Sequence, residues 1–333
     1  MGVSLSGLAT AVANEGGIGV ISVAGLGLVY KKKSKDYFEA CVEGLKEEIS
    51  KAREKSKGII GVNIMVAMSN FADMVKTSIT EKVDVIFSGA GLALDLPSFL
   101  TKDSKTKLVP IVSSARAFAL ICNKWKKNYG YLPDAVVVEG PKAGGHLGYK
   151  RSEINDNNYS LEQILPDVIK HAKEIELQTG KKIPVIAAGG IYTGKDIYEI
   201  MKSGVDAVQL GSRFVTTEEC DADIEFKKAY LKSAEKDIVL IDSPVGLPGR
   251  AILGEFIDRV KQGLTKPKAC SFHCIKTCDY TKSPYCIMIA LYNAGKGNLK
   301  RGFVFAGTNA YLADKIVSVK ETIAKLKREY YDR

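Results

Sequence analysis

The sequence of 333 residues predicts an α/β fold, a (β/α)8 barrel lacking its first strand, followed by a small C-terminal extension. Three observations predict this fold. Short apolar runs alternate with segments of helical periodicity, which is typical of βαβ units. The runs are continuously apolar, as parallel strands covered on both faces are. The chain also opens on a helix pattern instead of a strand.

Seven runs rich in β-branched residues are predicted strands. They are Ile18–Val23, Ile59–Val66, Val83–Phe87, Leu108–Val112, Ala135–Val138, Ile183–Ala187 and Ala207–Leu210. Between them lie helices such as the one after Thr193, where Asp196 has capping-box spacing and Gly204 ends the pattern. An open doubly wound sheet can also have seven strands, whereas a closed barrel needs eight. The number of strands alone therefore does not decide between the two folds.

The beginning of the chain favours the barrel. Leu5, Leu8, Ala9 and Val12 stand at i, i+3, i+4 and i+7, which predicts an amphipathic helix almost at once. A regular alternation that begins on a helix predicts that the first strand is absent from this sequence. The two strands that would flank it are then expected to have unpaired edges.

Composition limits the class of protein. Hydrophobic residues make up 46% of the chain, but no apolar stretch of 18 residues predicts a membrane span. The start carries no secretory signal pattern, and seven cysteines, an odd number, suit a reducing compartment, so we expect a cytoplasmic protein. The net charge of +10 comes from dispersed lysines, which predicts no nucleic-acid partner but favours an anionic cofactor or substrate.

The last two predicted strands end in glycine-containing turns. "AAGGI" contains Gly189 and Gly190, and "QLGSRF" runs from Gln209 through Gly211. The loops after strands seven and eight of a barrel commonly bind phosphate, because glycines let backbone N–H groups converge on an anion. Asn63 interrupts another apolar run. Its amide either ties neighbouring strands together or contacts a ligand at the barrel mouth.

His146 is one of three histidines and lies in "EGPKAGGHLG", directly after a predicted strand. Imidazole exchanges protons near neutral pH, so His146 is a candidate acid–base residue. The alternative is a loop histidine bonded to nearby backbone. Gly144 and Gly145 favour the first interpretation, because they let the backbone come close to a ligand.

The chain changes in character after residue 265, so we expect a barrel over residues 1–265 and an extension over residues 266–333 packed on it. The extension contains Cys270, Cys274, Cys278 and Cys286. On a helix the first three would share a face, which would suit zinc or an iron–sulfur cluster. Buried structural thiols are the alternative. Residues 242–252 are expected to form a loop at the substrate entry, with Arg250 either facing an anion or lying on the surface.

Over residues 1–265 the chain resembles the nitronate monooxygenase (2-nitropropane dioxygenase-like) family of FMN-dependent barrels. The resemblance rests on "GVSLSGLATAVANEGGIGVIS", "GVNI", "EGPKAGGHLG", "IPVIAAGGI" and "VDAVQLGSRF", in this order. FMN-dependent enoyl-acyl-carrier-protein reductases share the scaffold and the AGGH element. Relatives usually begin with a strand and a glycine-rich turn, whereas this sequence begins at Met1, Gly2, Val3 and Ser4.

The resemblance implies that His146 is the catalytic histidine beside the flavin. It also implies that two sets of residues contact FMN. The first set is Asn63, Gly144, Gly189 and Gly190. The second set is Gln209, Leu210, Gly211 and Ser212. Glu139 departs from the glutamine often found in the monooxygenases and matches the glutamate of the reductases.

The function that the resemblance implies is oxidation of alkyl nitronates by O2 to carbonyl compounds and nitrite. One alternative is an NAD(P)H-dependent enoyl-thioester reductase in which reduced FMN delivers hydride. An alternative of another class is a non-catalytic thiol- or metal-binding protein on a barrel scaffold, in which the four cysteines would be the functional site.

Overall fold

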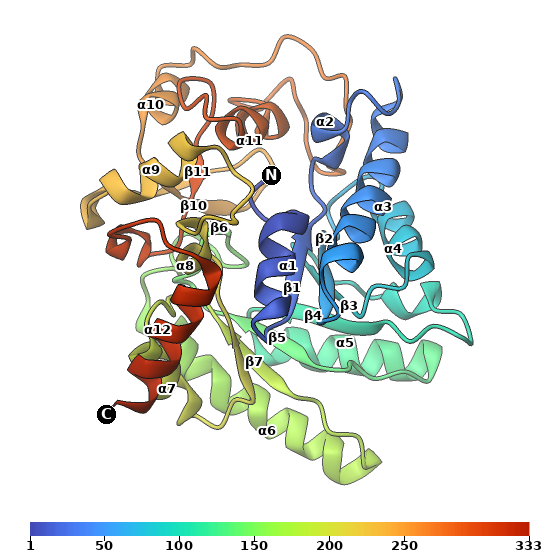
Figure 1. Cartoon of the computed structure of the whole chain (residues 1–333). Coiled ribbons are helices and arrows are strands. Elements are labelled where there is room, and N and C mark those ends of the chain that lie inside the picture. Colours follow the sequence, from blue (N-terminus) through green and yellow to red (C-terminus); the bar gives the residue numbers. More distant parts are fainter. Residues whose placement is uncertain (333) are drawn as a thin grey trace.

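A computed structural model describes residues 1–332 and contains a seven-stranded parallel sheet curled into a half-barrel (Figure 1). The strand order follows the chain, with β6 outside this sheet: β1 (Gly19–Ser22), β2 (Ile60–Met65), β3 (Val85–Gly89), β4 (Lys107–Val112), β5 (Val136–Glu139), β7 (Val185–Ala188) and β8 (Ala207–Gln209). All seven predicted strands are present, and the predicted α/β barrel class is confirmed.

Helices cover the outer face of the sheet. In chain order they are α1 (Ser6–Asn14), α2 (Leu26–Val29), α3 (Tyr37–Lys55), α4 (Phe71–Thr80), α5 (Ala115–Tyr129), α6 (Leu161–Thr179), α7 (Gly194–Met201) and α8 (Ser212–Val215). The main core lies between these helices and the sheet and contains the fully buried Trp125 and Phe118. A smaller apolar cluster, which includes Phe87 and Val137, fills the inner side of the half-barrel.

The first residues of the chain lie beside the open edge of the half-barrel. The Ser22 N–H of β1 donates to the Ser4 carbonyl over 2.8 Å, and the Asp221 N–H donates to the Val3 carbonyl over 3.1 Å. The Asp221 carboxylate in turn accepts from N–H groups at the start of α1, including that of Leu5 at 2.7 Å. The expectation of unpaired edges is therefore wrong in part, because residues 3–4 cover one edge position of β1.

A second, antiparallel sheet lies near the mouth of the half-barrel. It consists of β6 (Gly145–His146), β9 (Ile238–Asp242), β10 (Pro248–Ile252) and β11 (Val304–Phe305), with β10 pairing the other three. The loop expected over residues 242–252 is therefore half wrong. Residues 243–247 are a turn, but Pro248–Ile252 is a strand at the centre of this sheet.

The C-terminal part contributes α9 (Ile224–Lys232), α10 (Glu255–Lys261), α11 (Ile287–Gly295) and α12 (Val319–Tyr331). The last of these packs on α7, where the Gly194 N–H donates to the Glu329 carboxylate over 2.9 Å. Residues 262–285 form no helix, so the shared helical face expected for Cys270, Cys274 and Cys278 is wrong. Across residues 1–332, no helix has the length and apolar character needed to cross a membrane.

Candidate active site

His146 lies on the two-residue strand β6, which the antiparallel sheet positions at the mouth of the half-barrel. His146 pairs with Gly249 of β10, and its Nε2 atom is 2.7 Å from the Ser243 hydroxyl. The Phe305 ring of β11 packs edge-on against the imidazole, with 5.0 Å between the ring centres. Burial lowers the pKa of His146 to about 4, because desolvation disfavours the imidazolium ion. The imidazole is therefore neutral at pH 7.

Ser243 is the residue that sequence analysis missed. It occupies the turn between β9 and β10, where its carbonyl accepts from the Gly246 N–H over 2.9 Å. Its hydroxyl also accepts from the Val245 N–H over 3.3 Å. Ser243 is 97 positions from His146 in the chain, so only the pairing of β10 with β6 brings the two together.

Arg250 holds the loop that leads to His146. Its side chain is only 5% exposed, and Nη1 donates to the carbonyls of Pro141 and Ala143 over 2.6 Å each. Burial lowers the pKa of Arg250 to about 10, which leaves the guanidinium charged at neutral pH. The surface position expected for Arg250 is wrong, because the side chain is buried and bonded to these two carbonyls, whereas the alternative that Arg250 faces an anion stays a prediction.

Three polar side chains face the inside of the half-barrel near the ends of the strands. Asn63, Glu139 and Gln209 alternate with the residues of the outer core, as period-two strand geometry requires. None of the three side chains makes a hydrogen bond to another described residue. Burial raises the pKa of Glu139 to about 7, since the carboxylate would be poorly solvated there. Unpaired polar groups at such a position are available to a ligand.

The glycine turns after β7 and β8 carry unused backbone donors. The N–H groups of Gly190, Gly211 and Ser212 make no hydrogen bond to another described residue. Gly190 has a φ of +80°, which side chains of L-residues rarely adopt, and a Cβ there would lie 2.9 Å from the Lys142 side chain. The neighbouring Gly189 and the partly exposed Leu210 complete the two turns. Three free N–H donors form a site suited to an anion.

The segment of residues 304–309 joins these turns to the His146 loop. The Gly307 N–H donates to the Ser212 hydroxyl over 2.8 Å, and the Asn309 amide donates to the Gly190 carbonyl over 2.7 Å. Gly144 packs against the same segment so closely that a Cβ would lie 2.5 Å from the Gly307 nitrogen. Close packing within the chain is therefore sufficient to explain why residue 144 is a glycine. The contacts of Gly144, Gly190 and Ser212 with FMN remain predictions.

The model of the family described as nitronate monooxygenase matches residues 1–329. The chain belongs to the nitronate monooxygenase family. Among curated relatives, a probable nitronate monooxygenase of Staphylococcus haemolyticus is 35% identical over 134 residues, which cover 39% of this chain and 34% of that protein.

Other similar proteins carry different names. The chain is 25% identical over 256 residues to a (3aS,4S,5R,7aS)-5-hydroxy-7a-methyl-1-oxo-octahydro-1H-indene-4-carboxyl-CoA dehydrogenase of Mycobacterium tuberculosis, covering 77% of this chain. The matched regions span about a third and about three fifths of the length of these two curated relatives.

Solved structures share the fold over almost the entire chain. FabK from Thermotoga maritima superposes with a TM-score of 0.75 at 26% identity, covering 99% of this chain and 90% of FabK. Nitroalkane oxidase from Streptomyces ansochromogenes superposes with a TM-score of 0.74, covering 99% and 93%, and at 19% identity supports the fold alone. Membership of this family supports an oxidoreductase.

Proposed function

We propose that this protein is an FMN-dependent nitronate monooxygenase, which oxidises alkyl nitronates with O2 to carbonyl compounds and nitrite. The observation that carries the proposal is the position of His146 at the mouth of the half-barrel, where it contacts Ser243 and is joined through residues 304–309 to turns with free N–H donors. The family and the similarity to a probable nitronate monooxygenase support it.

The residues present fit a flavin mononucleotide. The free N–H groups of Gly190, Gly211 and Ser212 would hold the phosphate, and Leu210 would pack beside it. Unpaired amides of Asn63 and Gln209 on the inner face would donate to the polar edge of the ring, near which Gly144 and Gly189 would lie. When bound, the flavin would supply the electron transfer between substrate and O2.

His146 would bind and deprotonate the substrate. In the form that donates from Nε2 to the Ser243 hydroxyl, the imidazole keeps the lone pair of Nδ1 for the proton on the carbon next to the nitro group. After protonation, the imidazolium would attract the nitronate anion. Because the pKa of His146 is about 4, the free imidazole is the resting form over the whole neutral range.

Turnover of a preformed nitronate tests the proposal. Purified protein with FMN is mixed in air with the anion of 2-nitropropane, and nitrite and O2 consumption are measured. With neutral 2-nitropropane, which must first lose its carbon proton, we expect His146→Ala to lower kcat/KM at least about 100-fold, the usual contribution of an acid–base residue. The control is His171→Gln, on the outer helix α6 beside Phe118, which should retain turnover. Wild-type protein that binds FMN but forms no nitrite would contradict the proposal.

The reductase is the second candidate, because FabK from Thermotoga maritima is similar over almost the full chain and Glu139 matches the reductase branch. Anaerobic mixing separates the two functions. Rapid bleaching of the flavin by NADPH alone would favour the reductase, whereas bleaching that requires a nitronate supports the monooxygenase.

A further inference from the structure

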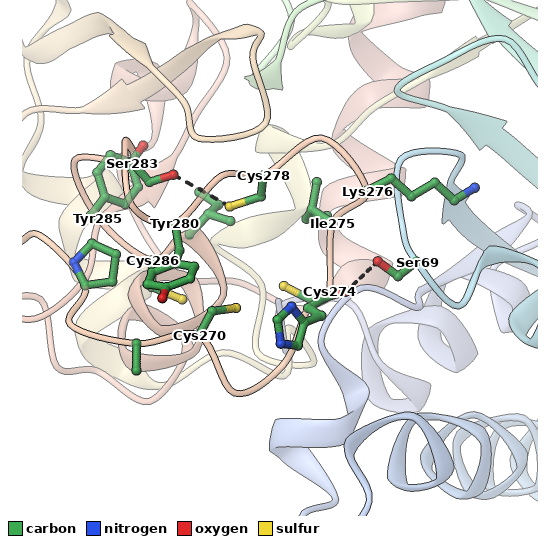
Figure 2. Close-up of a pocket in the computed structure, with 14 residues that line it drawn as sticks. Ser69, Cys270, Cys274, Ile275, Lys276, Cys278, Tyr280, Ser283, Tyr285 and Cys286 are labelled. Carbon is green, nitrogen blue, oxygen red and sulfur yellow. Dashed lines mark hydrogen bonds between the residues drawn. The ribbon is translucent and has the colours of Figure 1, made fainter.

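Four of the seven cysteines line one cavity, which lies outside the site described above. Cys270, Cys274, Cys278 and Cys286 surround a space of about 210 Å³, and Figure 2 shows their side chains on its walls. Cys274 is buried and the other three are partly exposed, and all four thiols are free. Apolar groups such as Ile275, Ile287 and the ring of Tyr285 form much of the remaining wall.

The loop that carries these thiols is fixed to the half-barrel by its backbone. The Cys274 carbonyl accepts from the Ser69 N–H over 3.1 Å, and the Lys276 N–H donates to the Ala67 carbonyl over 2.9 Å. His273, directly before Cys274, has a φ of +42°, a conformation that costs about 1 kcal/mol or more in a residue other than glycine. Tertiary contacts therefore hold Cys274 in place against a local backbone preference.

Two of the four thiols lie on segments next to the cavity. Cys286 stands at the start of the nine-residue helix α11, and its side chain makes no capping hydrogen bond there. The Cys278 sulfur is 3.6 Å from the Ser283 hydroxyl, and because that hydroxyl donates to the Asp279 carbonyl over 2.7 Å, the Cys278 thiol is the donor to Ser283. Loss of the thiol proton would free the Cys278 sulfur to bind a metal.

The arrangement does not suit a single metal ion. Within residues 1–332, no three side chains of Cys, His, Asp or Glu are grouped so that they could hold a metal ion. A tetrahedral zinc site with bonds of about 2.3 Å requires its sulfurs within about 3.8 Å of one another. An iron–sulfur cluster places each thiolate on the outside of an inorganic core, so its ligands surround a cavity instead of meeting at a point.

We propose that Cys270, Cys274, Cys278 and Cys286 bind an iron–sulfur cluster in this cavity. Four thiolates are the standard ligand set for both [2Fe–2S] and [4Fe–4S] clusters. Each thiol releases a proton when it binds iron, and a preformed cluster brings both its iron and its inorganic sulfide, so its transfer to the four thiols is a ligand exchange without oxidation or reduction.

The cluster site adjoins the candidate active site. Tyr285, on the cavity wall, donates from its hydroxyl to the Asp242 carbonyl over 3.3 Å, directly before Ser243. The Thr277 hydroxyl donates to the Val245 carbonyl over 3.1 Å. A bound cluster would therefore brace the turn that carries the partner of His146.

Iron and acid-labile sulfide, measured per chain after anaerobic purification and reconstitution with a mixture of ferrous and ferric iron and sulfide, test the proposal. We expect about two or about four of each, with an electron paramagnetic resonance signal in one oxidation state. Zinc in place of iron, iron without sulfide, or no metal would overturn it. The iron and sulfide measurement does not depend on flavin or on nitronate turnover. Failure of the cluster proposal can therefore be told apart from failure of the proposed function.

Variants assign the ligands. We expect Cys274→Ala and Cys286→Ala each to retain less than about a tenth of the wild-type iron. The matched control is Cys122→Ala, which removes an equally buried thiol from α5, outside the cavity, and should keep its iron. Full iron and sulfide in both cavity variants would overturn the assignment. If a cavity variant fails to fold, the wild-type stoichiometry alone decides.

Discussion

Glu139 makes a quantitative prediction about stability, because its carboxyl group sits on the inner face of the half-barrel without a cation or hydrogen-bond donor. Burial raises its pKa from 4.5 to about 7. Each pKa unit represents about 1.4 kcal/mol, so the change corresponds to about 3 kcal/mol between the protonated and ionised folded states. The folded protein therefore binds this proton more tightly than the unfolded chain does.

The direction of the pH effect follows from that difference. The contribution of Glu139 to stability is complete below pH 4.5, declines as the pH rises, and is lost above about pH 7. Between pH 5 and pH 8 the loss amounts to about 2.5 kcal/mol. The Gln side chain in Glu139→Gln has no proton to lose. Between pH 5 and pH 8, the free energy of unfolding of this variant should therefore fall by about 2.5 kcal/mol less than that of the wild type.

Urea unfolding at pH 5 and pH 8, at equal flavin occupancy, measures the effect. Glu162→Gln is the control, because Glu162 is exposed in the first turn of α6 and its removal should leave the pH dependence within about 0.5 kcal/mol of the wild type. If Glu139→Gln and Glu162→Gln give the same pH dependence, Glu139 is solvated or paired in solution, and the reasoning from burial is wrong.

Three further substitutions test the site. Ser243→Ala removes the partner of His146, and we expect about a tenfold lower kcat for neutral 2-nitropropane with a change in stability of about 1 kcal/mol, checked by nitrite assay and thermal melting. Gly190→Ala should weaken FMN binding at least about tenfold in a fluorescence titration, whereas Gly180→Ala, with a similar φ but open space around it, should cost only about 1 kcal/mol of stability and leave FMN affinity unchanged. Arg250→Met leaves two buried carbonyl groups without a hydrogen-bond donor, so the free energy of unfolding in urea should fall by about 3 kcal/mol. A fall of less than about 1 kcal/mol would show that the carbonyls find other donors.

The parallel strands could be predicted from the sequence because both of their faces are covered. A run such as Val136–Val138 is apolar throughout and is bounded by polar or glycine residues, which marks it without any knowledge of its neighbours. The antiparallel sheet offers no such signal. Its strands β6 and β11 have two residues each, and their pairing with β10 depends on contacts between distant parts of the chain.

The candidate site divides in the same way. His146 and the glycine turns could be proposed because they follow strands whose ends must meet at one edge of the sheet. Ser243 could not, since a serine in a turn between Asp242 and Pro244 belongs to no periodic pattern. The helical face expected for Cys274 and its neighbours failed for a related reason. Spacing suggests a helix, but the isolated β-bridge between Ile275 and Met68 holds this segment against the half-barrel, and a turn follows it.

The strand and turn at residues 304–309 have a consequence for how the protein matures. During synthesis the chain is made from the N-terminal end, so Gly190 and Ser212 leave the ribosome about a hundred residues before Gly307 and Asn309. Until those late residues arrive, the turns lack the contacts that fix them, and a nascent barrel would hold a nucleotide poorly. Loading of the proposed flavin would then be one of the last events in biogenesis, and a product shortened before residue 304 would be made without it.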